Sequence, residues 1–162
     1  MTVAGSAVQY ATFSVAGHFL GIDVLRVQEV LREQRLTPVP LAPDVVQGLI
    51  NLRGQIVPAL DMRRLLKLPA REDGAAPLSI VVHTAQGPVS LQVDEIGDVI
   101  HLDSATFQSA PENVDPGVRR LMAGVHKLKD RLLLVLDTAR ATEAAGAADT
   151  SANRSHHVEK AE

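Results

Sequence analysis

The sequence has no cysteine and few aromatic residues: it contains no tryptophan, one tyrosine and three phenylalanines in 162 residues. The absence of cysteine excludes a disulfide framework and a thiolate metal site. Hydrophobic residues still make up 46% of the chain, so its core must be built from valine, leucine and isoleucine. Valine and isoleucine are β-branched and suit half-buried strands. The composition therefore favours an all-β protein.

The chain also lacks long hydrophobic runs and a strongly basic stretch. The longest apolar run, Leu132–Leu136, is far too short to cross a membrane. The net charge is −3, with acidic and basic residues interspersed, so no basic stripe is available to follow phosphates. The N-terminus does not read as a secretory signal. We expect a cytoplasmic protein that neither binds nucleic acid nor inserts into a membrane.

No constellation of catalytic or ligand-binding residues is evident. The six histidines lack metal-ligand spacing, no serine lies in a nucleophile elbow, and no glycine-rich loop resembles a phosphate cradle. His83 and His126 are predicted to be ordinary residues on strand faces. An acidic cluster is typical of a solvated surface: Asp94, Glu95, Asp98 and Asp103. The sequence predicts no catalytic, metal or cofactor site, and hence no enzyme.

The most informative pattern is an internal repeat. Gly48–Asp61 (GLINLRGQIVPALD) and Gly124–Asp137 (GVHKLKDRLLLVLD) align without a gap, with matching apolar positions and a basic residue, Arg53 or Lys129, at the same place. Upstream, Ile22-Asp23 corresponds to Val93-Asp94, and Tyr10–Val15 resembles Ser79–Thr84. The three matches occur in the same order in both halves. We interpret them as a duplication in which each half contributes about five short strands.

Turn signals divide the chain into segments. Residues 1–7 are predicted to be a flexible N-terminus, 8–68 a first β-barrel subdomain, 69–77 a linker, 78–142 a second barrel, and 143–162 a disordered tail of Ala, Ser, Thr and charged residues. Sheets this short must close or pair to cover their edges, and two small barrels are expected to pack together. Met62–Leu66 is predicted to be a short helix. Pro58, inside a strand pattern, predicts an edge strand or a bulge.

Several segments resemble CheW, the chemotaxis coupling-protein family. Gly21–Leu31 (GIDVLRVQEVL) and Val46–Gly54 (VQGLINLRG) carry the characteristic part of this resemblance, and Gln55–Arg64 continues it. In the second half, Val93–Val99 (VDEIGDV) and Leu133–Asp137 are similar to the family's pattern. The resemblance extends from about Gln9 to Arg140.

The resemblance implies two tandem SH3-like, five-stranded β-barrels around a shared hydrophobic core, in agreement with the repeat. It also implies an adaptor that couples methyl-accepting chemoreceptors to the histidine kinase CheA and is recruited to membrane-associated receptor arrays. One barrel would bind the regulatory domain of the kinase, and the groove between the barrels would bind the helical tip of the receptor. A coupling protein of gliding or pilus-based motility would fit the same residues. A small β-barrel enzyme or ligand-binding module would instead need a deep pocket with convergent polar groups.

The resemblance assigns partner contacts to six residues: Val27, Glu29, Gly48, Asn51, Arg53 and Val99. An amphipathic receptor helix would lie with its apolar side against the two valines, and charged residues would fix its register. Ordinary core packing explains the same valines equally well. From its position alone, Arg53 lies at a hairpin tip beside Gly54, where either a partner contact or a solvated side chain is expected.

Overall fold

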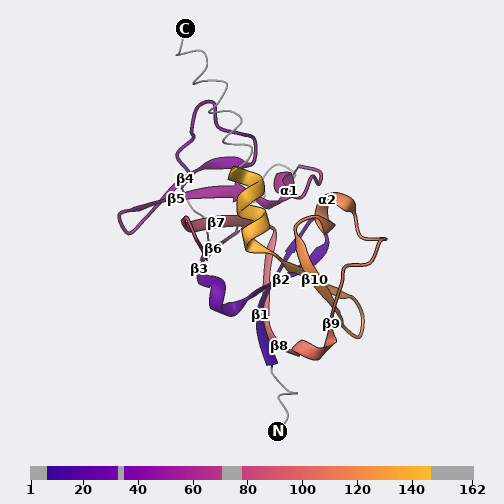
Figure 1. Ribbon diagram of the computed structural model, residues 1–162. Helices are drawn as coiled ribbons and strands as arrows, with labels where there is room; N and C mark the ends of the chain where they lie inside the picture. Colours follow the sequence, from indigo (N-terminus) through magenta and orange to yellow (C-terminus); the bar gives the residue numbers. More distant parts are fainter. Residues whose placement is uncertain (1–6, 33–34, 71–77, 147–162) are drawn as a thin grey trace.

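The computed structural model describes residues 7–32, 35–70 and 78–146, which form two β-sheets with a few short helices (Figure 1). The first sheet, sheet A, has the strand order β8-β1-β2-β11-β10-β9. Its strands are β1 (Ala7–Val15), β2 (His18–Asp23), β8 (Glu95–Asp103), β9 (Phe107–Gln108), β10 (Met122–Lys127) and β11 (Leu132–Leu136).

The second sheet, sheet B, has the order β3-β6-β7-β5-β4. Its strands are β3 (Val27–Arg32), β4 (Val46–Leu52), β5 (Gln55–Asp61), β6 (Leu78–Thr84) and β7 (Gly87–Val93). Short helices connect the strands: η1 (Val24–Arg26), α1 (Met62–Leu65), η2 (Ser104–Thr106) and α2 (Pro116–Arg119). The prediction of a mainly β fold with a few short helices is confirmed, and α1 lies where a short helix was predicted.

Each sheet takes strands from both halves of the chain. The β1–β2 hairpin pairs with β8 on one side and, in parallel, with β11 on the other. The β6–β7 hairpin pairs with β3 and, in parallel, with β5. This arrangement corrects the prediction of one barrel at 8–68 and another at 78–142, because the two halves exchange their first hairpins. Apolar alternation shows which residues form a hairpin, but not which sheet that hairpin joins.

The repeat seen in the sequence is present in the strand pairing. In the β4–β5 hairpin, Val46 pairs with Leu60 and Gly48 with Ala59, with a bulge between Val46 and Gly48. In the β10–β11 hairpin, Met122 pairs with Leu136 and Gly124 with Val135, again with a bulge between them. The two hairpins thus share their register and their irregularity at the positions that the ungapped alignment equates.

The buried apolar residues form three clusters, of which the largest holds the two sheets together. The largest contains residues from both sheets, such as Phe13 and Leu20 of sheet A and Ile80 and Leu91 of sheet B. A second cluster, around Val57, lies within sheet B. A third fills the interior of sheet A and consists of Tyr10, Leu133 and Val135 with partly buried neighbours. We call the largest one the shared core. Each sheet therefore covers a small core of its own and one face of the shared core.

Two local expectations differ from the structure. Pro58 lies in β5, which is an inner strand between β7 and β4, and the nearby bulge is on β4 rather than on β5. Proline is tolerated there because the pairing of β5 with β7 begins only at Ala59. The C-terminal boundary also differs: residues 138–146 form a helix, and Ala141 and Ala145 are buried in the shared core. The tail predicted at 143–162 therefore begins within this helix, and residues 147–162 lie outside the described part of the chain.

Candidate partner-binding surface

An ion pair joins the two edge strands of sheet B. Glu29 lies on β3, at one edge of the sheet, and Arg53 lies in the turn between β4, the opposite edge, and β5. The guanidinium donates to both carboxylate oxygens: Nη2 to Oε2, and Nη1 to Oε1 at 3.3 Å. Contact between the two edges means that the sheet curls into a barrel, as predicted. The Arg53 side chain is 69% exposed, so the pair faces solvent at the barrel end.

The turn that carries Arg53 has a defined backbone geometry. Arg53 has a φ of 51° and Gly54 a φ of 88°, the pair of positive angles that a two-residue hairpin turn requires. Asn51 stabilises this turn because its side-chain Oδ1 accepts a hydrogen bond from Gly54 N at 2.9 Å. Asn51 therefore positions Arg53 through the turn, and the Asn51 side chain is itself exposed.

The pair is fully charged near neutral pH. The hydrogen bond from Arg53 is the main reason that the pKa of Glu29 lies below its usual value. The same bond raises the pKa of Arg53. A bidentate arginine–carboxylate pair fixes both side chains in orientation as well as in charge. The end of this barrel consequently presents a rigid, polar feature.

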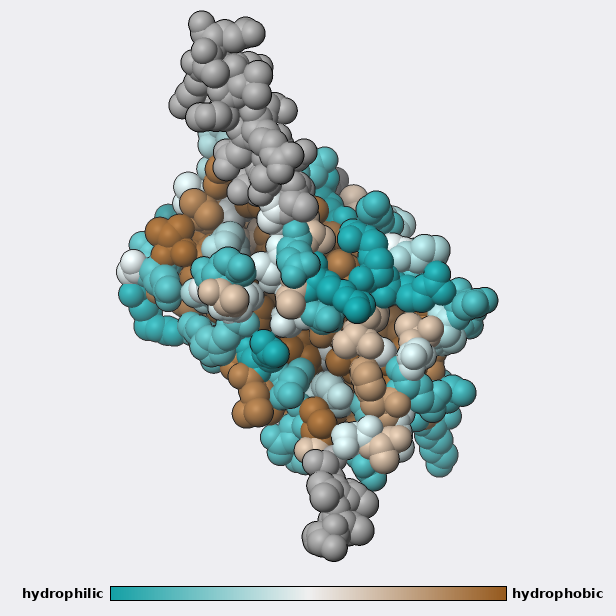
Figure 2. Space-filling view, viewed as in Figure 1, coloured by the Kyte–Doolittle hydropathy of each residue, from teal (hydrophilic) through white to brown (hydrophobic). Residues whose placement is uncertain are grey.

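Large apolar side chains are exposed on β5 and on η1. Figure 2 shows hydrophobic surface over the tip of the β4–β5 hairpin and, below it, over η1. Ile56 of β5 is 57% exposed and Leu25 of η1 is 85% exposed. Neither residue was predicted from the sequence. Ile56 could have been found by alternation, because its neighbour Val57 is completely buried and the side chains of a strand point alternately to opposite faces.

Val27 and Val30 lie on the face of sheet B that covers the shared core. Val27 pairs with Val82 and Val30 with Ile80, both of which are shared-core residues, and directly paired residues lie on the same face of a sheet. Val27 is partly buried against that core, whereas Val30 is 45% exposed. Glu29 pairs with Val81, on the opposite face. A bulge between Val27 and Glu29 produces this change of face.

Val99 occupies a comparable place on sheet A. It pairs with Ala11, which in turn pairs with Ile22, so the three side chains form a row on the shared-core face. Ile22 is buried, and Val99, on the edge strand β8, is 50% exposed. Each sheet therefore has exposed valine at the edge of its shared-core face. Core packing therefore does not account for Val99, because half of its surface is exposed, whereas Val27 packs partly into the shared core.

Gly48 is buried, and its position is explained by packing. The Thr37 backbone crosses directly over it, and a Cβ atom on Gly48 would lie 2.8 Å from Thr37 O. Thr37 and the next residue, Leu49, exchange two backbone hydrogen bonds of 2.9 Å. The backbone at Gly48 therefore approaches Thr37 more closely than any side chain would permit. Of the six predicted contact residues, Glu29, Asn51 and Arg53 come together at one barrel end.

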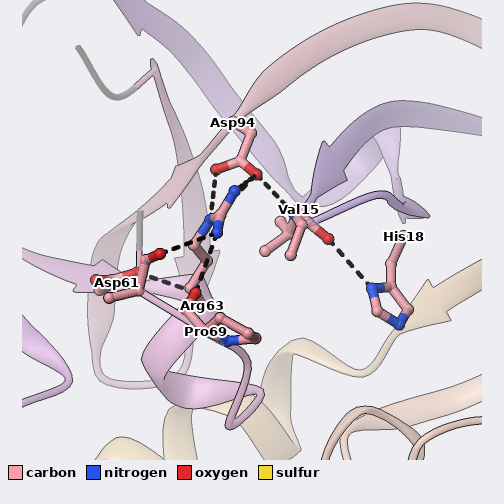
Figure 3. A network of polar contacts seen from close by, with 8 residues as sticks. Val15, His18, Asp61, Arg63, Pro69 and Asp94 are labelled. Carbon is pink, nitrogen blue, oxygen red and sulfur yellow. Dashed lines mark hydrogen bonds and ion pairs between the residues drawn. The ribbon is translucent and has the colours of Figure 1, made fainter. Parts of the chain in front are cut away.

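A second polar network, not predicted from the sequence, joins the two sheets (Figure 3). Arg63 of α1 donates to Asp94, with Nε 3.1 Å from Oδ1 and Nη2 2.7 Å from Oδ2. Asp94 Oδ2 also accepts from Ala16 N, in the β1–β2 turn, at 2.6 Å. Arg63 Nη1 donates to Pro69 O at 3.0 Å. Both charged side chains are only 18% exposed, so this pair is largely buried.

His126 is a further buried polar residue. His83 is exposed, as predicted for a strand-face residue, but His126 is fully buried and bonded at both ring nitrogens. Nε2 lies 3.1 Å from the Tyr10 hydroxyl and Nδ1 lies 2.8 Å from Thr106 Oγ1. Burial lowers the pKa of His126, so the ring is neutral. The prediction that His126 is an ordinary strand-face residue was wrong. Its apolar strand neighbours do not indicate which face of the strand the ring occupies.

Within residues 7–32, 35–70 and 78–146, no cluster of three or more His, Asp or Glu side chains could hold a metal ion. In the same ranges, no helix has the length and apolar character needed to span a bilayer.

An open groove of about 810 Å³ lies between β4–β5 and the helix at 138–146, but neither Val27 nor Val99 lines it. Two barrels with a shared core, an exposed ion pair and apolar edges define a protein-binding scaffold.

Comparison with known proteins identifies the family. The family model for the CheW-like domain matches residues 9–145. The chemotaxis protein CheW of Bacillus subtilis is 33% identical over 125 residues, covering 77% of this chain and 80% of the relative. CheW of Klebsiella aerogenes is 30% identical over 129 residues, covering 80% and 78%. The chain therefore belongs to the CheW-like domain family.

A solved structure agrees with this assignment. The crystal structure of the scaffolding protein TtCheW from Thermoanaerobacter tengcongensis has a TM-score of 0.73 and 26% sequence identity, and the match covers 80% of this chain and 88% of that one. The resemblance inferred from the GIDV and INLRG segments is confirmed. The chain is a chemotaxis scaffold of the CheW type and not an enzyme.

Proposed function

We propose that this protein couples methyl-accepting chemoreceptors to the histidine kinase CheA by binding both at once, in the cytoplasm beside membrane-associated receptor arrays. The proposal rests on one observation: two different kinds of surface are present, and on β3 they lie on opposite faces of sheet B. One is the polar barrel end with Glu29 and Arg53, and the other consists of the exposed apolar edges with Val30 and Val99. An adaptor must contact two partners without competition between them.

The barrel end suits the regulatory domain of the kinase. Arg53 is oriented by Glu29 and by the turn that Asn51 stabilises, so little side-chain freedom is lost when a partner binds. Exposed Ile56 adds apolar area beside the charge. Arginine is one of the residues that most often dominate binding energy at such interfaces.

The apolar edges suit the helical tip of a receptor. A helix that lies in a groove is held by apolar residues along one face, with charges setting its register. Val27 and Val30 on β3 and Val99 on β8 offer apolar contact from the two sheets. Binding across both edges would make the receptor contact depend on how the two sheets are placed relative to each other.

The variant Arg53→Ala tests the kinase contact. We expect binding of the purified kinase regulatory domain, measured by calorimetric titration, to weaken about ten-fold or more, because truncation removes an oriented hot-spot side chain. The matched control is Lys129→Ala, because Lys129 occupies the equivalent place in the repeated hairpin and is also exposed. A folded Arg53→Ala protein that binds the kinase domain as tightly as the Lys129→Ala control would contradict the assignment.

A further inference from the structure

The chain crosses between the two sheets at two aspartates. Asp23 ends β2 of sheet A and is followed by η1 and β3 of sheet B. Asp94 lies between β7 of sheet B and β8 of sheet A. The internal repeat equates these two residues. Each crossing leads within a few residues to one of the valines at the shared-core edges, Val27 or Val99. The geometry of the crossings, together with packing in the shared core, therefore sets where the two edges lie relative to each other.

The two crossings are fixed differently. Asp23 Oδ1 accepts from Leu25 N at 3.0 Å and so caps η1, an exposed contact within one segment. Asp94 instead binds the Arg63 guanidinium through both oxygens and the Ala16 amide through Oδ2. Its own amide donates to Ser14 O at 2.9 Å. Asp94 is therefore bonded to residues that belong to other segments of the chain.

The Asp94 network includes parts of both sheets. Ser14 and Ala16 belong to β1 and the β1–β2 turn of sheet A, whereas Arg63 follows directly on β5 of sheet B. Arg63 is itself held in place, because its backbone amide donates to Asp61 Oδ1 at 2.9 Å and its Nη1 donates to the carbonyl oxygens of Pro69 and Ala70. Figure 3 shows the guanidinium between the Asp94 carboxylate and the Pro69 carbonyl. A forked, largely buried pair of this kind constrains direction as well as distance.

We propose that Arg63 and Asp94 are positioning residues that fix the angle between sheets A and B and so hold Val99 in place for the receptor. This inference rests on the proposed function, because it concerns the surface to which the receptor would bind. Neither residue needs to contact a partner. The kinase contact around Arg53 lies within sheet B and does not depend on this angle. Loss of the network should therefore weaken receptor binding much more than kinase binding.

A distance measurement tests directly whether Arg63 and Asp94 fix the angle between the two sheets. The protein has no cysteine, so two can be introduced for spin labels at exposed turn residues, Gln86→Cys in sheet B and Lys129→Cys in sheet A. We expect one narrow distance distribution by pulsed electron resonance, and a broadened one when Arg63→Ala is added. The control is Arg64→Ala in the same helix, whose side chain is 43% exposed and pairs with Asp61 at 3.5 Å. This control should leave the distribution narrow.

Two further measurements separate positioning from general destabilisation. Arg63→Ala should weaken binding of a receptor hairpin fragment about ten-fold, with kinase-domain binding changed by about two-fold or less, whereas partial unfolding would weaken both equally. Arg63→Lys keeps the positive charge but loses the forked N–H donors of the guanidinium. It replaces Arg63→Ala in these measurements if that variant does not fold. It should broaden the distance distribution as well.

Two results would overturn the inference: a folded Arg63 variant with an unchanged distance distribution, or equal losses of receptor and kinase binding. If the unsubstituted protein binds neither fragment, the proposed function fails, and the distance measurement still decides whether Arg63 fixes the two sheets.

Discussion

Gly48 offers the clearest separation of a packing role from a partner contact, because the family resemblance and the structure give it different roles. In Gly48→Ala the new Cβ would lie 2.8 Å from Thr37 O and 3.2 Å from the Leu36 Cβ. The closer of these atoms belongs to the backbone, which cannot turn away as a flexible side chain does. The strand must therefore shift, and overpacking of this kind costs about 1–3 kcal/mol.

The same shift loosens the two hydrogen bonds between Thr37 and Leu49. Loss of either bond would destabilise the folded protein by about 1 kcal/mol more. For a chain of this size, a destabilisation of 1 kcal/mol lowers the melting temperature by about 2–4 °C. Urea unfolding followed by circular dichroism should show a lower midpoint with an unchanged slope. Gly146→Ala is the control, since a Cβ atom there meets nothing within 4 Å. A Gly48→Ala protein with normal stability and weakened partner binding would refute the packing explanation.

Two other predictions concern buried residues, one in sheet A and one in the shared core. Because burial lowers the pKa of His126 in the folded state, the unfolded chain binds the proton first, so stability is complete above about pH 6.5 and falls as the pH drops below it. Unfolding midpoints measured between pH 7.5 and 5 should show this loss, and His126→Gln should flatten it; an unchanged slope in that variant would contradict the assignment. Ala145→Asp should destabilise the protein by about 2 kcal/mol, because it places a charge in the shared core, whereas Glu143→Ala, at an exposed helical position, should have no measurable effect. Equal unfolding midpoints for these two variants would show that the helix does not dock.

Local patterns predicted the hairpins well and their partners poorly. The alignment of Gly48–Asp61 with Gly124–Asp137 anticipated two corresponding hairpins, because a hairpin pattern is local, whereas their common register and bulge were found only in the structure. The exchange of β1–β2 and β6–β7 between the halves was not predicted. The alternation of these strands is the same whichever sheet they join, and the choice is made by long-range packing in the shared core.

The candidate site shows the same division. Arg53 was located at an exposed turn, because turn signals are local. The pairing of Arg63 with Asp94 was missed, since these residues belong to different halves and nothing in their neighbourhoods links them. The helix at 138–146 was partly missed because its alanines suggested disorder. Ala141 and Ala145 lie one turn apart and bury the same face, which is a weak signal among so many alanines.

Simultaneous binding is the property on which the proposed coupling function depends most directly. Calorimetric titration of the purified protein with a receptor hairpin fragment, in the presence and absence of a saturating kinase regulatory domain, measures it. We predict that the receptor fragment binds with the same affinity in both titrations, so that all three proteins form one complex. A receptor affinity that falls in proportion to the kinase domain added would mean that the two partners compete, and would contradict the account.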